Sequence, residues 1–338
     1  MEIPVELGNH AYTVTVKRGT LAQAHRYMQL NRKVLIVTDT GVPEVYAKTV
    51  AAGCKDPYIV TIPAGEDSKN IRQFEHLCRT MLQHGFTRSD CVVAVGGGVV
   101  GDLAGFAAAS FMRGIDFYNV PTTVLSQVDS SIGGKVAIDL DGIKNCVGAF
   151  HQPKAVLIDP DVLVTLPPRH IANGLAEAIK MAITFDDDLF ALFETTDPLQ
   201  HIDEIITASL RIKAGVVKAD EKENGLRRVL NFGHTIGHGI EAATGLQTVY
   251  HGECVALGML PMCADTIRPR VQAVLKKTGL SGRCNIDPAA VWEAISHDKK
   301  LSGDTITVIT SKQIGSFEMQ QMPLSDFKET VLQFCKQF

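Results

Sequence analysis

The chain has 338 residues, of which 45% are hydrophobic and 21% are charged, and its formal net charge is −4. This length and hydrophobic content predict one large or two medium domains with full cores. The acidic balance and the lack of a dense lysine or arginine run argue against a nucleic-acid-binding surface.

Eight cysteines are scattered through the sequence without a C-x-x-C pair, and the first residues show no basic, apolar leader. Cys91 and Cys254 lie within apolar runs, as reduced cysteines commonly do. Residues 92–111 resemble a membrane span, but a glycine triplet and the single charge of Asp102 favour a buried strand, a turn and a buried helix. We therefore expect a soluble, cytoplasmic protein without membrane contact.

The first half of the sequence alternates strand-like and helix-like patterns. Residues 2–7 and 12–17 alternate apolar and polar side chains around Gly8-Asn9-His10, which predicts a β-hairpin. Further strands are expected at 33–39, 58–62, 91–95 and 155–159, and helices at 43–53 and 68–84. Strands and helices in this alternation predict a Rossmann-like α/β domain with a doubly wound parallel sheet.

A glycine-rich segment, Gly96-Gly-Gly-Val-Val-Gly-Asp102, follows one of these strands and precedes a helix expected at 103–110. Glycine lets the backbone approach a pyrophosphate, and a helix N-terminus favours negative charge. The context predicts a nucleotide site, although tight turns between strand and helix also use glycine for packing alone. Asp39, at the end of its own strand, could hold a ribose hydroxyl or cap a helix.

Helical patterns dominate after residue 160, so we place the boundary there and expect an α/β domain at 1–160 and a mainly helical domain at 161–338. A short strand pair is expected within the second domain at 305–310 and 315–320. The expected helices cover 169–183, 199–219, 252–267, 270–278, 288–297 and 325–336.

The stretch 227–241 is expected to lie on a helix that ends at Gly245, with 227–230 either helical or a loop leading into the helix. It carries His234 and His238 four residues apart. This spacing places both imidazoles on one face. His251 follows soon after, and three clustered imidazoles predict a metal site, with core or surface histidines as the alternative. In an earlier helix, Glu177 and Lys180 are three residues apart and share a face.

Five motifs in this order resemble the 3-dehydroquinate synthases, namely residues 96–114, 120–135, 174–180, 230–241 and 251–253. The resemblance implies an N-terminal Rossmann-like domain that binds NAD and a C-terminal helical domain that binds a divalent metal, zinc or cobalt. It also implies that 3-deoxy-D-arabino-heptulosonate 7-phosphate is converted to 3-dehydroquinate and phosphate, an early step of the shikimate pathway towards chorismate and the aromatic amino acids.

The resemblance also implies roles for single residues. It implies that His238 faces the substrate and that the three metal ligands are Glu177, His234 and His251. The implied NAD contacts are Asp39, Glu66, Lys69, Gly97, Gly98, Val99, Asp102, Thr122, Thr123, Lys135, Lys144 and Thr165. The implied substrate and catalytic residues are Asp129, Lys135, Asn145, Lys180, Lys213, Arg227, Asn231, His238 and one lysine of Lys299 and Lys300.

The chemistry of these residues fits an anionic substrate, because lysine and arginine bind carboxylate and phosphate through charge-assisted hydrogen bonds. A carboxylate and two imidazoles leave coordination positions open for substrate oxygens. Four positions depart from the usual family pattern: Val136, Asp139, Ile143 and His151.

Three other functions remain alternatives. One is a different sugar phosphate cyclase, a second is a metal- and NAD-dependent alcohol or glycerol dehydrogenase, and the third is a non-catalytic binding protein with the same fold. A dehydrogenase would release NADH and would have no use for the cationic residues Lys135, Lys180, Lys213 and Arg227. We expect a small phosphorylated sugar acid as the substrate and a homodimer as the working form.

Overall fold

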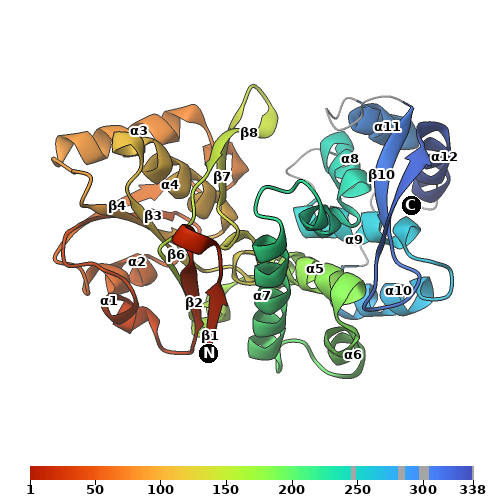
Figure 1. Cartoon of the computed structure of the whole chain (residues 1–338), viewed down its shortest axis with the longest axis horizontal. Helices are drawn as coiled ribbons and strands as arrows, with labels where there is room; N and C mark the ends of the chain where they lie inside the picture. The colour runs from red at the N-terminus through yellow and green to blue at the C-terminus, as the bar shows by residue number, and fades with distance from the viewer. Residues whose placement is uncertain (245–248, 281–285, 297–303, 337–338) are drawn as a thin grey trace. The chain divides into compact units, whose positions relative to one another are not determined.

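The computed structural model describes residues 1–244, 249–280, 286–296 and 304–336, and the chain divides into two compact units (Figure 1). The first unit consists of Met1–Pro167 and Lys213–Glu221, and the second of Pro168–Ile212 and Lys222–Phe338. The sequence analysis did not foresee that residues 213–221 would group with the first unit. The binding role of each domain stays a prediction.

The first unit is built on one seven-stranded sheet. Its strands are β1 (Glu2–Val5), β2 (Tyr12–Val16), β3 (Lys33–Asp39), β4 (Asp56–Ile62), β5 (Cys91–Gly96), β6 (Asp116–Pro121) and β9 (Ala155–Ile158). They lie in the order β1-β2-β9-β6-β5-β3-β4. The pair β1–β2 is antiparallel, as its hairpin pattern predicts, and all other neighbours are parallel.

Helices cover both faces of this sheet, as Figure 1 shows. They are α1 (Ala24–Tyr27), α2 (Glu44–Ala51), α3 (Ile71–Gln83) and α4 (Gly98–Ser110). Successive strand residues point to opposite faces, so Leu35 and Val37 of β3 pack in the core that α3 and α4 share. Val34 and Ile36 pack in the core that includes α1 and α2. Burial on both faces explains why β3 and β5 are continuously apolar over residues 34–37 and 91–95.

The apolar segment 92–111 consists of β5, a short turn and the buried helix α4, as expected. Helix α4 begins at Gly98, five residues earlier than the sequence predicted, so most of the glycine-rich segment is helical. Within the described residues, no helix is both long enough and apolar enough to cross a membrane.

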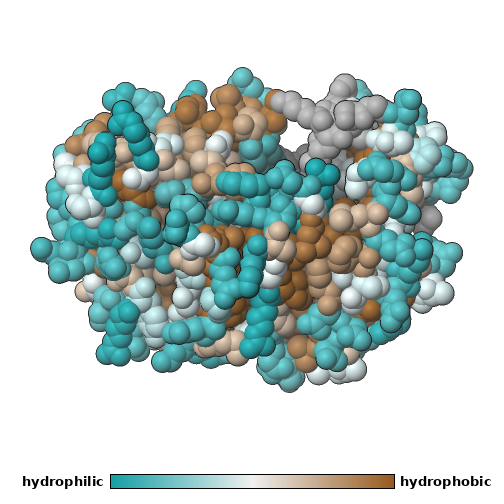
Figure 2. Space-filling model, in the orientation of Figure 1, coloured by the Kyte–Doolittle hydropathy of each residue, from teal (hydrophilic) through white to brown (hydrophobic). Residues whose placement is uncertain are grey.

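A hairpin formed by β7 (Lys135–Leu140) and β8 (Ile143–Phe150) was not expected from the sequence. It forms a separate two-stranded sheet in the first unit. Hydrophilic residues cover much of the visible face of each unit in Figure 2. The hairpin nevertheless exposes three large apolar side chains, Leu140, Ile143 and Phe150.

The second unit is mainly helical, as predicted. It contains α5 (Pro168–Phe185), α6 (Asp187–Thr195), most of α7 (Ile202–Ala219), α8 (His234–Thr244), α9 (His251–Met259), α10 (Arg268–Lys277), α11 (Pro288–Ser296) and α12 (Leu324–Cys335). The expected strand pair is present as β10 (Thr305–Thr310) and β11 (Glu318–Pro323). Helix α6 was missed, and β11 begins three residues later than expected.

The expectation of one continuous helix over 227–241 is wrong. Residues Leu226–Asn231 form a 3₁₀ helix, and α8 begins only at His234. Gly233, between the two, has a φ of 76°, a left-handed conformation that favours glycine. A Cβ at Gly233 would also lie 2.8 Å from the backbone nitrogen of Met259. The expected end of the helix at Gly245 lies outside the described residues.

Glycines also bring α5, α8 and α9 unusually close together. A Cβ on Gly258 of α9 would lie 2.1 Å from the carbonyl oxygen of Gly233. A Cβ on Gly252 would lie 2.1 Å from the carbonyl oxygen of Asn173 on α5. Since backbone atoms cannot move aside as a flexible side chain can, these helices pack at this distance only with glycine at both positions.

We predict that Gly258→Ala lowers the free energy of unfolding by roughly 1–3 kcal/mol, because the added methyl group overpacks a backbone contact. Gly215→Ala is the matched control, since Gly215 lies within α7 and a Cβ added there would have no atom within 4 Å. Replacing an open helical glycine by alanine should stabilise by about 0.5–1 kcal/mol. Urea denaturation measures both values. Equal stability of the two variants would contradict the close packing of α8 and α9.

Candidate metal and active site

The centre of the second unit is a buried carboxylate, Glu177 on α5, whose side chain is 1% exposed. Lys180, one turn further along α5, donates from Nζ to Oε2 of Glu177 and, at 2.6 Å, to the carbonyl oxygen of Leu230. The shared face that the sequence predicts for these two residues is therefore confirmed. Lys180 thus hydrogen-bonds to Oε2 of Glu177. The other oxygen of this carboxylate, Oε1, points toward other groups.

That second oxygen lies near two imidazoles. Oε1 of Glu177 is 3.5 Å from Nε2 of His234 and 3.5 Å from Nε2 of His251. Although it is buried, Oε1 has no hydrogen-bond partner within the described part of the chain. Zinc bonds of about 2.0–2.1 Å in a tetrahedral arrangement separate neighbouring ligand atoms by about 3.3 Å. The three groups therefore fit a divalent metal between them.

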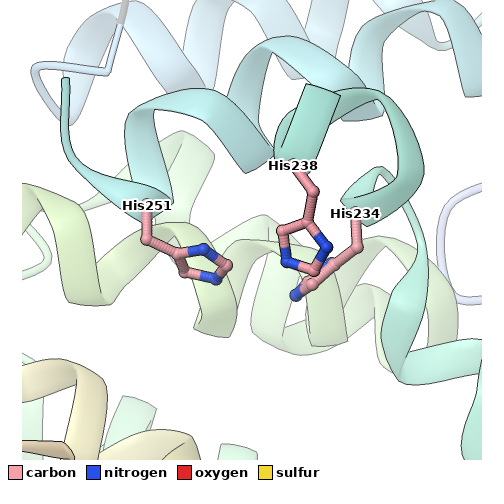
Figure 3. A group of neighbouring side chains, drawn as sticks. All are labelled: His234, His238 and His251. Carbon is pink, nitrogen blue, oxygen red and sulfur yellow. The ribbon is translucent and has the colours of Figure 1, made fainter. Parts of the chain in front are cut away.

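His238 lies close to this group. Figure 3 shows three rings that point toward one another, His234 and His238 from α8 and His251 from the start of α9. The ligand atoms of all three histidines lie within 4.8 Å of one another. The ring centroid of His238 is 5.4 Å from that of His234 and 5.6 Å from that of His251. The predicted common face of His234 and His238 is confirmed, while the ligand set stays a prediction.

The electrostatics keep Glu177 ionised. Burial alone would raise the pKa of its carboxyl, but the Lys180 ammonium and the two imidazoles hold that pKa well below its usual value. Burial and the nearby Lys180 charge lower the pKa of His234 well below its usual value, so this imidazole is neutral. A carboxylate and a neutral imidazole are the forms that bind a metal.

His251 differs from His234 because two carboxylates lie beside it. Burial alone would lower its pKa, but Glu177 and Glu241 raise the pKa of His251 to about 9. A metal ion bound by His251 would displace a proton from it. The sequence analysis did not single out Glu241, which lies on α8 at i+7 from His234.

The first turn of α9 is held against α5 by a second set of residues, to which the sequence analysis gave no role. Arg169 donates to both carboxylate oxygens of Glu253, at 2.7 and 2.8 Å. Glu253 in turn accepts a hydrogen bond of 2.9 Å from the backbone nitrogen of Tyr250, the N-cap residue of α9. The Arg169 guanidinium also stacks 4.2 Å from the Tyr250 ring centroid. These contacts fix where α9 begins, and hence where His251 lies relative to Glu177.

The expected NAD residues of the first unit gather at one edge of its sheet. Asp39 ends β3, Gly97 and Gly98 follow β5, and Thr122 and Thr123 follow β6. Strand order reverses between β3 and β5, where ligands of doubly wound folds bind. Glu66 and Lys69 follow β4, Val99 and Asp102 lie in the first turns of α4, and Thr165 follows β9.

The glycines of this edge pack closely against neighbouring side chains. A Cβ on Gly97 would lie 3.1 Å from Thr123, and one on Gly98 would lie 3.2 Å from the Ser130 hydroxyl. Asp39 accepts a hydrogen bond of 2.7 Å from the backbone nitrogen of Gly41, so one of its oxygens closes a turn. Asp39 therefore caps no helix through this contact, and its role toward a ribose stays a prediction.

Two of the expected NAD residues pair with each other. Nζ of Lys69 lies 2.6 Å from Asp102 and also donates to the side-chain oxygen of Asn145. Burial raises the pKa of the Asp102 carboxyl, and the Lys69 ammonium opposes that rise. Lys69 thus ties α4 to the β7–β8 hairpin, in which Asn145 has a φ of 53°. Lys135 is exposed and Lys144 half-buried on the same hairpin.

Three of the residues that depart from the usual family pattern make contacts in this part of the first unit, namely Val136, Asp139 and His151. Asp139 accepts a hydrogen bond of 2.7 Å from the backbone nitrogen of Asn145, which supports the left-handed turn. Val136 packs over Gly105, where a Cβ would lie 2.4 Å from its side chain. Nε2 of His151 lies 2.9 Å from the carbonyl oxygen of Ile115. Ile143 is exposed.

The expected substrate residues are partly paired within each unit. Lys213 lies 2.9 Å from Oδ1 of Asp129 and donates to the Asp129 carbonyl oxygen at 2.6 Å. Asn231 donates to Glu223 at 2.6 Å. Arg227 is only 3% exposed, which excludes a solvated surface residue. Lys299 and Lys300 lie outside the described residues.

The whole fold is shared with solved structures of cyclases. One is a 2-deoxy-scyllo-inosose synthase complexed with carbaglucose-6-phosphate, NAD⁺ and Co²⁺, with a TM-score of 0.89 and 24% identity over 98% of this chain and 100% of that one. Another is the 2-epi-5-epi-valiolone synthase of Streptomyces hygroscopicus subsp. jinggangensis with NAD⁺ and Zn²⁺ bound, with a TM-score of 0.86 and 26% identity over 98% of each chain. Fold and site together define an enzyme of the sugar phosphate cyclase class.

The sequence identifies the family within this class of enzymes. Residues 59–173 match the 3-dehydroquinate synthase N-terminal family and residues 174–301 match the 3-dehydroquinate synthase C-terminal family. A 3-dehydroquinate synthase of Streptococcus sanguinis (strain SK36) is 40% identical over 97% of this chain and 99% of its own length. The chain belongs to the 3-dehydroquinate synthase family, whose members are carbon–oxygen lyases.

We predict that His251→Ala weakens zinc binding by more than the roughly 10- to 100-fold that loss of an outer contact to a metal ligand costs. The reason is that one of three protein ligands is removed. His76→Ala, at an exposed histidine of α3, is the control and should bind zinc as the wild type does. Chelator competition with elemental analysis measures the affinity and the stoichiometry. Stoichiometric zinc of unchanged affinity in His251→Ala would contradict the assignment.

Proposed function

We propose that this enzyme converts 3-deoxy-D-arabino-heptulosonate 7-phosphate to 3-dehydroquinate and phosphate, with Glu177, His234 and His251 as the metal ligands. The observation that carries the proposal is the approach of both Nε2 atoms to the orphaned Oε1 of Glu177, each at 3.5 Å. Family membership over nearly the whole chain supports the substrate.

Each part of the chain has a separate task in this reaction. When bound, NAD accepts and returns a hydride and the divalent metal polarises substrate oxygens, so that the net reaction is an elimination of phosphate with ring closure. The protein contributes position and charge. Glu177 and two imidazoles leave coordination positions open. Lys180 holds the orientation of Glu177 through Oε2.

The proposed substrate residues supply positive charge for a molecule that carries a carboxylate and a phosphate. Lys180, Lys213 and Arg227 are nearly buried in the described structure, with 2%, 5% and 3% of each residue exposed. A buried cation is costly unless an anion compensates it. Glu177 and Asp129 do so in part for the two lysines. An arginine can grip a carboxylate or phosphate through two parallel hydrogen bonds, so we assign Arg227 to that task.

His238 is the proposed proton-handling group of the site. Its ring lies beside those of His234 and His251 (Figure 3), which supports a role at the same site. An imidazole changes protonation near neutral pH, which suits transfer of a proton at a substrate oxygen. The NAD contacts, from Asp39 to Thr165, belong to the same proposal.

Two further properties are part of the proposal. A homodimer is expected from the family resemblance, and the exposed apolar side chains of the β7–β8 hairpin are compatible with a contact to a second copy. A cytoplasmic location is supported by the described cysteines, which form no disulfide with one another.

We predict that Arg227→Lys lowers kcat/KM for phosphate release by roughly 10- to 100-fold, about 1.4–2.7 kcal/mol, since lysine cannot reproduce the two parallel hydrogen bonds. Arg228→Lys is the matched control, because Arg228 is the neighbouring residue and is exposed. Phosphate release from 3-deoxy-D-arabino-heptulosonate 7-phosphate is measured with zinc and NAD⁺ present.

The same assay tests the proposed function. The wild-type protein should release one phosphate per substrate molecule with no lasting rise in absorbance at 340 nm. Steady accumulation of NADH in step with substrate loss would favour a dehydrogenase. Wild-type kcat/KM in Arg227→Lys would remove Arg227 from the substrate site.

A further inference from the structure

A second buried carboxylate, Glu241, lies beside the proposed metal ligands. It is 7% exposed and sits on α8, seven residues after His234 and three after His238. These helical spacings place all three side chains on one face of α8. Burying a charged carboxylate is costly unless other groups compensate it. Glu241 therefore needs a specific interaction at this place.

The contacts of His251 supply one. Its Nδ1 lies 3.5 Å from Oε2 of Glu241, while its Nε2 lies 3.5 Å from Oε1 of Glu177 on the other side of the ring. The imidazole thus has a carboxylate at each nitrogen. A histidine that binds a metal through Nε2 commonly donates from Nδ1 to a carboxylate or a carbonyl oxygen, which fixes the tautomer and the plane of the ring.

Comparison with His234 shows what Glu241 does. Nδ1 of His234 lies 3.1 Å from the carbonyl oxygen of Phe232, so a backbone atom orients this ring. His251 has a side chain, Glu241, in the equivalent position. His251 is also less enclosed, since 30% of its side chain is exposed against 12% for His234. The surrounding protein therefore confines the ring of His251 less than that of His234. The orientation of the His251 ring depends more on its hydrogen-bond acceptor.

We infer that Glu241 is a positioning residue for the metal site: its carboxylate accepts the Nδ1 proton of His251, orients Nε2 toward Glu177 and makes the imidazole a stronger donor to the metal. This inference rests on the proposed function, because it takes Glu177, His234 and His251 as the ligands. Glu241 does not touch the metal or the substrate. Its charge acts through His251.

Zinc affinity of the full-length protein tests the inference without reference to activity. Glu241→Ala should raise the zinc dissociation constant by roughly 10- to 100-fold. Glu241→Gln keeps the shape and an acceptor oxygen but loses the charge, so a smaller rise of roughly threefold to tenfold is expected. Glu293→Ala is the matched control. This exposed carboxylate belongs to α11, whose Val291 and Ile295 pack against Gly239 of α8.

A second measurement separates orientation of His251 from support of the fold. Each variant is loaded with Co²⁺, whose visible absorption reports the ligand geometry, and the melting temperature of the metal-free protein is recorded. The inference predicts a changed Co²⁺ spectrum in both Glu241 variants and an unchanged one in Glu293→Ala. Wild-type zinc affinity and Co²⁺ spectrum in folded Glu241→Gln would overturn the inference, whether or not Glu241→Ala folds.

Failure of this inference can be told from failure of the proposed metal site. If His251→Ala loses zinc while both Glu241 variants keep it at wild-type affinity, only the role of Glu241 is wrong. If His251→Ala itself retains zinc, the ligand set is wrong and the inference about Glu241 falls with it.

Discussion

The site of the second unit depends on one buried carboxylate, Glu177, whose two oxygens have different surroundings. Oε2 is engaged by Lys180, and Oε1 faces the Nε2 atoms of His234 and His251. A buried carboxylate oxygen that accepts no hydrogen bond is costly. A divalent metal at Oε1 would remove that cost. The same lysine that lowers the pKa of Glu177 also lowers that of His234, so both groups are held in the forms that bind metal.

This arrangement requires that α5, α8 and α9 lie very close together. Gly252 and Gly258 allow α9 to contact the backbones of Asn173 and Gly233, and Arg169 and Glu253 hold the first turn of α9 against α5. His251 is the first residue of α9. Its position therefore follows from backbone contacts and a capping interaction, and Glu241 then sets the orientation of its ring. Metal affinity in this family member should consequently respond to residues that never touch the metal.

Much of the first unit could be predicted from the sequence because local patterns determine it. Strands β3 and β5 are short, continuously apolar runs, and both faces of each are covered by helices. Their alternation with helices and the glycine-rich segment after β5 were visible in the sequence, although α4 begins five residues earlier than expected. The β7–β8 hairpin was missed because Asp141-Gly142, which directly joins the two strands, was not recognised as a turn. That dipeptide is a strong hairpin signal.

Parts of the site in the second unit could not be predicted from local sequence patterns. The four-residue spacing of His234 and His238 correctly predicted a common helical face, because that relation is local. The approach of Glu177 to histidines 57 and 74 residues further along the chain is a tertiary relation, which only the family motifs could suggest. The helix expected over 227–241 begins only at His234, because the pattern of apolar residues gave no sign of the left-handed Gly233. Glu241 was overlooked since a single acidic residue near a helix end usually faces solvent.

The ligand set can be observed directly by anomalous diffraction from crystals of the zinc-loaded protein, recorded on both sides of the zinc absorption edge. One strong peak should lie about 2.0–2.2 Å from Oε1 of Glu177 and from Nε2 of both His234 and His251. A peak bound by His234, His238 and His251 with Glu177 still paired only to Lys180, or no peak at this position, would contradict the central role of the Glu177 carboxylate.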